Sequence, residues 1–200
     1  MNTQECNVEV AVYQQSKHGE PYCGDSYYYI ELENQFVCIL VDGLGSGKFA
    51  AESSQIVINT FKENINQSQH HFVKTVNKQL LCKRGVVLGI LKIDLDAHVY
   101  TFSSIGNIGL ITTDGSRKKK RNIPSAGYLA SYHQDFKVTQ ENIEKDMNFI
   151  MFSDGIKDTE LSKPYMLHSD VNDLVKSFTR MNSNVRDDDS TLIAMKYIRF

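Results

Sequence analysis

A chain of 200 residues fits one medium-sized domain or two very small ones, and we expect a single domain spanning residues 1–200. Its formal net charge of −2 gives no indication of binding to nucleic acid or to an anionic membrane surface. The cysteines lack the C-x-x-C spacing of a zinc site, and the sequence has neither a signal peptide pattern nor an apolar run of membrane-spanning length, so we expect reduced thiols in a soluble cytoplasmic protein.

The first third of the chain predicts strands followed by helices. Residues 8–14 and 27–32 predict two strands, and a short hairpin connection leads from the second of these to a continuous apolar run at 36–41. Such a run is typical of a strand covered on both faces. Apolar residues then recur on one helical face from Phe49, which predicts a helix capped near Ser46. The next helix is predicted at about 72–81.

The rest of the chain is dominated by strands. Residues 85–122 are rich in β-branched side chains and interrupted by turn sequences, which predicts an antiparallel meander. A strand at 147–152 follows, then a helix near 171–181 and a last strand at 191–198. Because hairpins dominate and strands outnumber helices, we expect an α+β sandwich of antiparallel sheets.

The stretch "VDGLGSGKFAA" at 41–51 is superficially similar to a nucleotide-binding P-loop. The P-loop pattern G-x-x-x-x-G-K-[ST] would need glycine at 42 and a hydroxyl residue at 49, where this sequence has Asp42 and Phe49. Since phenylalanine cannot bind a metal ion, the pattern argues against nucleotide binding. An acidic residue at the end of a buried strand, followed by glycines, favours a metal site instead.

Four aspartates share this context, because each lies at the edge of a predicted strand beside glycine or another acid: Asp25, Asp42, Asp154 and Asp188. Taken singly, each is explained as a turn residue or cap. Taken together, they predict a hard divalent cation, since oxygen ligands from distant segments can meet at one rim of a sheet. Mg²⁺ and Mn²⁺ are the natural candidates, because no cluster of histidine or cysteine indicates zinc.

The order of these motifs resembles the metal-dependent PPM/PP2C serine/threonine phosphatases, and more narrowly their bacterial SpoIIE-like branch. The resemblance spans nearly the whole chain, from "GD" at 24–25 through "DGLGSGKFAA" and "SDG" to "DDST". It implies a PP2C-like α-β-β-α sandwich with two Mn²⁺ or Mg²⁺ ions, about 3.5–4 Å apart, that activate a water for attack on phosphoserine or phosphothreonine. It further implies phosphorylated stressosome scaffold proteins as substrates, and negative feedback on the general stress response.

The same resemblance assigns roles to particular residues. Asp42 would bridge both ions, and the carbonyl of Gly43 would add a ligand to one. Asp154 and Asp188 would bind the other ion, while Asp25 would contact the site directly or through water. No side chain is assigned as nucleophile. Because residues 187–189 are all aspartate, aligning D-D-x-T-L with "DDSTL" favours Asp188 and leaves Asp187 and Asp189 open.

Further residues are candidates for supporting roles. Gly45, Ser46 and Gly47 leave room for a turn beside the metals and for an anion at the start of the next helix, although a plain tight turn explains them equally well. Asp158 and Asp189 are candidates for an extra ligand or for supporting the ligands, with helix capping the simpler role for Asp158.

The sequence also departs from the family pattern. Leu44 replaces a histidine that many members carry after the Asp-Gly pair, which leaves the general acid unassigned. Tyr28 replaces the second aspartate of G-D-x-x-D, a pattern frequent in the SpoIIE-like branch. These departures keep open a catalytically weak pseudophosphatase that acts as a binding module. The basic run 117–121 could dock an acidic or phosphorylated partner, but a solvated hairpin tip is the favoured interpretation.

Overall fold

The structure is a computed structural model that describes residues 6–130, 137–144, 146–183 and 185–198. Within these ranges two five-stranded antiparallel sheets form, with strand orders β1-β10-β9-β6-β7 and β2-β3-β4-β5-β8. The strands are β1 (Val8–Gln15), β2 (Asp25–Glu31), β3 (Gln35–Gly43), β4 (Val86–Asp94), β5 (Val99–Ile105), β6 (Gly109–Thr113), β7 (Lys119–Arg121), β8 (Lys137–Asn142), β9 (Asn148–Phe152) and β10 (Ser190–Tyr197). The helices are α1 (Lys48–Glu63), α2 (Gln69–Gln79), α3 (Asp158–Leu161), the 3₁₀ helix η1 (Pro164–Leu167) and α4 (Val171–Met181).

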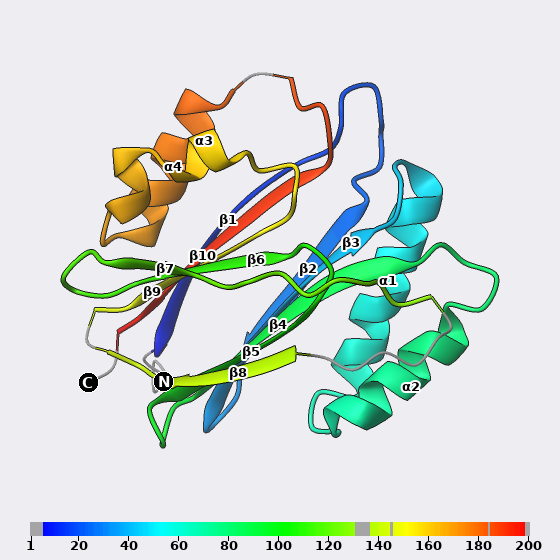
Figure 1. Cartoon of the computed structure of the whole chain (residues 1–200), viewed down its shortest axis with the longest axis horizontal. Helices are drawn as coiled ribbons and strands as arrows, with labels where there is room; N and C mark the ends of the chain where they lie inside the picture. The colour runs from blue at the N-terminus through cyan, green and yellow to red at the C-terminus, as the bar shows by residue number, and fades with distance from the viewer. Residues whose placement is uncertain (1–5, 131–136, 145, 184, 199–200) are drawn as a thin grey trace, which may run out of the picture.

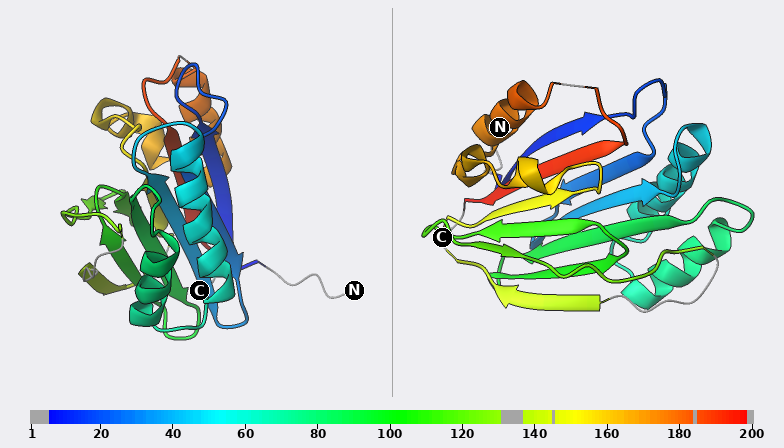
Figure 2. Two further views of the ribbon diagram at one scale, coloured as in Figure 1. Left: turned by 90° about the vertical axis from the view of Figure 1, so that its right-hand side faces the viewer. Right: turned by 45° about the horizontal axis from the view of Figure 1, so that its top comes forward.

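The two sheets stack face to face, and each carries helices on its outer face (Figures 1 and 2). Helices α1 and α2 cover the sheet that contains β3, while α3, η1 and α4 cover the sheet that contains β10. One apolar core lies between the sheets, and a further core lies under each helical layer. The expected α+β sandwich of two antiparallel sheets flanked by helices is therefore confirmed.

Strand β3 shows why an uninterrupted apolar run was required. Cys38 and Leu40 belong to the core between the sheets, whereas Val37 and Ile39 belong to the core beneath α1 and α2. Successive side chains of a strand point to opposite faces, so a strand buried on both sides needs apolar residues at every position. The next residue in the row that faces the other sheet is Asp42, which carries a carboxylate to the end of the inter-sheet core.

The predicted meander over 85–122 is wrong at its centre. Strands β4 and β5 pair, and so do β6 and β7, but β5 and β6 lie in different sheets, because β6 pairs with β9. The sequence at Gly106-Asn107 carries the chain from one sheet to the other instead of closing a hairpin. Gly106 has φ +86°, a left-handed conformation that favours glycine, and its N–H donates to the Ser125 carbonyl.

Smaller differences concern the ends of elements. Helix α1 begins at Lys48, and its first turn has no side-chain cap, so the predicted cap near Ser46 is replaced by Gly47. Strand β8, which completes one sheet beside β5, was not predicted. The cysteines Cys6, Cys23, Cys38 and Cys82 are free thiols, as expected. No helix among the described residues is both long and apolar enough to span a membrane.

Candidate active site

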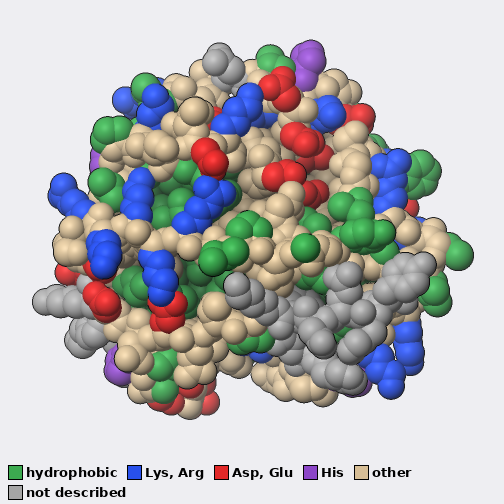
Figure 3. Space-filling model, in the orientation of Figure 1, with side chains coloured by type: hydrophobic (Ala, Val, Ile, Leu, Met, Phe, Trp, Pro, Cys, Tyr) green, Lys and Arg blue, Asp and Glu red, His purple; other side chains and the backbone are tan. Residues whose placement is uncertain are grey.

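The acidic residues from the two sheets meet at one end of the sandwich. Asp25, which begins β2, is the register partner of Asp42, near the end of β3. Asp154 follows β9 and Asp188 precedes β10, and these two strands are neighbours in the other sheet. Each of these carboxylates is close enough to Asp42 to raise its pKa by repulsion, as does Asp189. Acidic side chains accordingly gather above the middle of the face shown in Figure 3.

Asp25 is fixed by hydrogen bonds that cross from one sheet to the other. The residue is 3% exposed, and its Oδ2 accepts hydrogen bonds from Ser153 Oγ and Thr191 Oγ1, each at 2.7 Å. Ser153 Oγ in turn accepts from the Thr191 N–H at 2.9 Å. Asp25 Oδ1, in contrast, has no hydrogen-bond partner among the described residues. One oxygen is thus fixed by the protein and the other remains a buried, unused acceptor.

Ser153 and Thr191 were not predicted as site residues, although strand alternation indicates where they lie. Ser153 comes two residues after Met151, and Thr191 comes two residues before Ile193. Both Met151 and Ile193 belong to the core between the sheets. Because side chains two apart along a strand share a face, both hydroxyls point into the same space as the carboxylates of β2 and β3.

The three consecutive aspartates have different surroundings. Asp187 and Asp188 are both exposed. Asp187 forms an ion pair with Lys157 of the neighbouring loop, and the side chain of Asp188 accepts the N–H of Asp189 at 3.0 Å. Asp189 is 4% exposed, and its Oδ1 accepts the N–H of Lys17 at 2.9 Å. Its Oδ2 has no partner among the described residues and lies 2.8 Å from where a Cβ on Gly24 would be. Glycine at position 24 therefore leaves room for this carboxylate.

Asp154 has a partner that the sequence did not single out for the site. Its Oδ2 accepts a hydrogen bond of 2.7 Å from Asn107 Nδ2. Asn107 lies in the crossing between β5 and β6, so this passage between the sheets also supports the acidic cluster. Asp158, a candidate for an extra ligand, instead forms a 2.6 Å ion pair with Arg121 and is well exposed.

The cluster is electrostatically unfavourable without a cation. Burial, followed by repulsion from Asp25 and Asp154 first among its neighbours, raises the pKa of Asp42 to about 9. Burial also raises the pKa of Asp25 to about 7, although the two hydroxyl donors act in the opposite direction. The pKa of Asp154 is raised as well, by burial and by Asp188. The pKa values of these three carboxyl groups are all above their ordinary values, as expected for acids that are buried and held close together.

The donor set fits a hard divalent cation. The free oxygens are all carboxylate, and Asp25 Oδ1 and Asp189 Oδ2 are buried acceptors without donors among the described residues. In the described part of the chain no group of three or more acidic, histidine or cysteine side chains is arranged so that it could hold a metal ion by itself. Mg²⁺ needs fewer protein ligands, because it keeps several waters and takes only one or two carboxylates along with substrate phosphate.

The loop after β3 is tightly constrained. A Cβ on Gly43 would collide with the carbonyl group of Ala50, so the strand end and α1 approach each other with no room for a side chain. Gly45 and Gly47 have φ +93° and +72°, which glycine adopts readily. Ser46 is half-buried between them. The predicted phosphate-proximal loop is therefore a compact turn at the uncapped start of α1.

Leu44 and Tyr28, the two residues that depart from the PPM/PP2C pattern, lie at the margin of the acidic cluster. Leu44 packs against the core between the sheets, and its N–H donates to the Gly85 carbonyl at 2.9 Å. Tyr28 belongs to the helix-covered face, where Lys62 Nζ lies 4.7 Å from its ring centroid. The basic run contains the exposed strand β7, which forms a hairpin with β6, as interpreted from the sequence.

Comparison with known proteins adds to this geometry. No family model matches the chain. The chain is 29% identical over 187 residues to the phosphoserine phosphatase RsbX of Bacillus subtilis (strain 168), with 94% of each chain covered. A crystal structure of RsbX in complex with magnesium matches it with a TM-score of 0.84 at 29% identity, over 96% of each chain. The PP2C phosphatase domain of SpoIIE from Bacillus subtilis matches with a TM-score of 0.76 at 21% identity, over 96% of this chain and 63% of that one. The chain has the PP2C phosphatase fold and is similar, along nearly its whole length, to the phosphoserine phosphatase RsbX.

Proposed function

We propose that this protein is a metal-dependent protein phosphatase that hydrolyses phosphoserine or phosphothreonine on partner proteins. The observation that carries the proposal is the convergence of Asp25, Asp42, Asp154 and Asp188 at one end of a PP2C-type sandwich. The similarity to a phosphoserine phosphatase along nearly the whole chain supports the same chemistry.

The proposed centre holds two ions of Mn²⁺ or Mg²⁺. Asp42 would bridge them, and the Gly43 carbonyl would add a ligand to one, while Asp154 and Asp188 would hold the other. Asp25 would contribute the oxygen that receives no hydrogen bond. An all-oxygen donor set supports these ions over zinc, which favours nitrogen and sulfur. RsbX has been solved in complex with magnesium, which supports the same class of ion here.

The protein's own groups position this centre. Divalent ions bound at such a site lower the pKa of a water molecule and neutralise the charge of the phosphoryl oxygens. Ser153 and Thr191 orient Asp25, and Asn107 orients Asp154. The free N–H groups at the start of α1 favour an anion near the glycine turn. Leu44 has no proton to donate, and no other side chain is assigned to protonate the leaving oxygen.

The biological setting follows from the same similarity. We propose that residues 1–200 act as one catalytic domain on phosphorylated stressosome scaffold proteins, which would give negative feedback on the general stress response. Free thiols at all four cysteines are typical of a reducing compartment, and we place the protein in the cytoplasm.

The proposal is tested by measuring phosphate release from a phosphoserine-bearing scaffold protein with Mn²⁺, with Mg²⁺ and with EDTA. We expect turnover with a divalent ion and none in EDTA. A folded protein that is inactive with every ion would contradict it. In that case a second candidate is favoured by Leu44 and by the lack, among the described residues, of three acidic, histidine or cysteine side chains placed to hold a metal ion. This candidate is a pseudophosphatase binding module, which would still bind the phosphorylated protein without hydrolysing it.

A further inference from the structure

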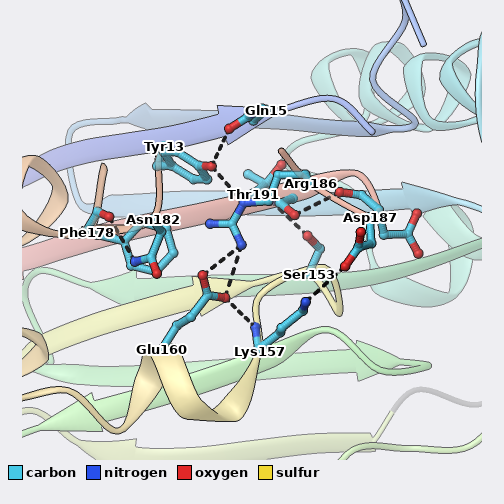
Figure 4. A network of polar contacts seen from close by, with 12 residues as sticks. Tyr13, Gln15, Ser153, Lys157, Glu160, Phe178, Asn182, Arg186, Asp187 and Thr191 are labelled. Carbon is cyan, nitrogen blue, oxygen red and sulfur yellow. Dashed lines mark hydrogen bonds and ion pairs between the residues drawn. The ribbon is translucent and has the colours of Figure 1, made fainter. Parts of the chain in front are cut away.

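Arg186 is a buried cation two residues before Asp188. The residue is 6% exposed, and its Nη1 lies 2.8 and 3.1 Å from the two carboxylate oxygens of Glu160 in α3. Its Nε donates to the Tyr13 hydroxyl of β1 at 2.9 Å. Figure 4 shows the guanidinium between Tyr13 and Glu160, and its central carbon lies 5.5 Å from the ring centroid of Phe178 in α4. One side chain therefore ties the turn before β10 to three other elements.

Glu160 extends this connection to the loop that carries Asp154. Its Oε2 accepts the backbone N–H of Lys157 at 2.7 Å, while both of its oxygens face Arg186. Lys157 also reaches across with its side chain, whose Nζ lies 3.0 Å from Asp187 Oδ2. The loop after β9 and the turn before β10 are thus joined twice, once by a buried ion pair and once at the surface. We call Lys157, Glu160 and Arg186 the brace.

Asp154 and Asp188 lie on the two segments that the brace joins, and few side-chain contacts hold their carboxylates in place. Asp188 is exposed, and among the described residues its side chain is bonded only to the N–H of Asp189. Asp154 accepts a side-chain hydrogen bond from Asn107, and backbone N–H groups of its own turn, at Asp154 and Gly155, also act on its carboxylate. Their separation is therefore set mainly by the backbones on which they stand. A cavity of about 220 Å³ lies between these backbones and is lined by Asp154, Asp188 and all three residues of the brace.

We propose that the brace sets the separation of Asp154 and Asp188, and that Arg186 is thereby a positioning residue for the metal centre. The inference rests on the proposed function, because it takes these two aspartates as ligands of one ion. It predicts that loosening the brace weakens the binding of the ion. Residues that orient metal ligands without touching the metal typically change affinity by about 10- to 100-fold when they are lost.

The test compares two charge-neutral double variants. Removing one member of a buried ion pair leaves an uncompensated charge, so both are changed together, as Arg186→Met with Glu160→Gln, in which glutamine still accepts the Lys157 N–H. The control, Lys120→Met with Glu141→Gln, removes the exposed ion pair between β7 and β8. Binding of Mn²⁺ is measured directly from the electron paramagnetic resonance of the free ion, and folding by circular dichroism in EDTA.

We expect the brace variant to raise the Kd for Mn²⁺ by about 10- to 100-fold and the control to leave it within about 2-fold. The brace variant should also need more Mn²⁺ for half-maximal hydrolysis while its rate at saturating Mn²⁺ stays near that of the wild type. A purely structural role would lower stability in EDTA without moving the Kd of the folded protein.

Equal Kd values for the folded brace variant and the wild type would overturn the inference. If the double variant does not fold, Lys157→Met decides, because it removes only the surface connection: a weaker Kd supports the brace and an unchanged Kd contradicts it. If the wild type binds Mn²⁺ and hydrolyses substrate while the brace variant has the same Kd, only the inference about the brace is contradicted. If the wild type binds no Mn²⁺, the proposed function is contradicted as well.

Discussion

Asp42 lies at a position where an ionised carboxylate is energetically unfavourable without a cation. It lies at the end of an apolar strand, paired in register with Asp25, and its pKa is raised to about 9 by burial and by four neighbouring aspartates. Such an arrangement weakens the metal-free fold, and in the proposed centre it holds a cation. Removing the Asp42 carboxylate should therefore raise stability and lower activity.

Replacing Asp42 with asparagine should therefore stabilise the metal-free protein while abolishing metal-dependent hydrolysis. We expect a gain of about 0.5–2 kcal/mol in the free energy of unfolding, measured with urea in EDTA. The control is Asp94→Asn, at an exposed turn where the carboxylate accepts the N–H groups of Asp96 and Ala97. It should change stability by less than about 0.5 kcal/mol. A clear loss of stability in Asp42→Asn would argue against electrostatic repulsion between Asp42 and the neighbouring aspartates.

The stability of the metal-free protein should also fall as the pH rises. With its pKa raised from 3.8 to about 9, the folded Asp42 keeps a proton that the unfolded chain has released, so the folded state binds more protons in this window. Unfolding free energies in EDTA should thus decrease between pH 5 and pH 8, and saturating Mn²⁺ should reduce this dependence. Stability that rises over the same range without metal would contradict the electrostatic description.

Asn107 is a supporting residue that can be tested separately. Its side chain donates to Asp154, so Asn107→Ala should raise the Mn²⁺ concentration for half-maximal activity by about 10-fold. The matched control is Asn59→Ala on the exposed face of α1, where the side chain accepts from Gln55. An unchanged Mn²⁺ requirement in Asn107→Ala would show that this hydrogen bond does not orient the ligand.

At the scale of elements, β3 could be predicted from its continuous apolar run and α1 from the recurrence of apolar residues on one helical face. Asp42 and Asp154 could be placed at strand ends because apolar runs stop there, and Asp25 and Asp188 could be placed near the starts of predicted strands. The crossing at Gly106-Asn107 could not be predicted, since the same turn sequence suits a hairpin and only the pairing of β6 with β9 distinguishes the two. Ser153 and Thr191 were missed because their roles depend on contact between strands distant in sequence.

The close approach of β3 and α1 gives a prediction at this scale. Gly43→Ala places a methyl group against the Ala50 carbonyl and should cost about 1–3 kcal/mol of unfolding free energy. It should also reduce metal-dependent activity, since Gly43 adjoins Asp42. Gly19→Ala serves as a control, because no atom lies within 4 Å of the added carbon and only its positive φ opposes the change. Equal stability losses in the two variants would argue against a specific collision.

At the scale of the whole molecule, the sandwich explains why acids from distant segments meet. Each sheet contributes two strand ends to the same edge, and hydrogen bonds from Ser153 and Thr191 to Asp25 fix the sheets to each other at that edge. The inter-sheet core that holds the strands in this alignment also carries the proposed metal ligands on its last row. The proposed active site and the folded core therefore share one interface, which is why activity and stability are linked in these predictions.

The most direct measurement is Mn²⁺-dependent phosphate release from a phosphoserine-bearing protein by the wild type, Asp42→Asn and Asp154→Asn, with Asp94→Asn as control. All four proteins are first shown to be folded. The prediction is turnover by the wild type and the control, and a rate no higher than that in EDTA for the two site variants. Full activity in folded Asp42→Asn, or none in the wild type, would contradict an active centre at the acidic cluster.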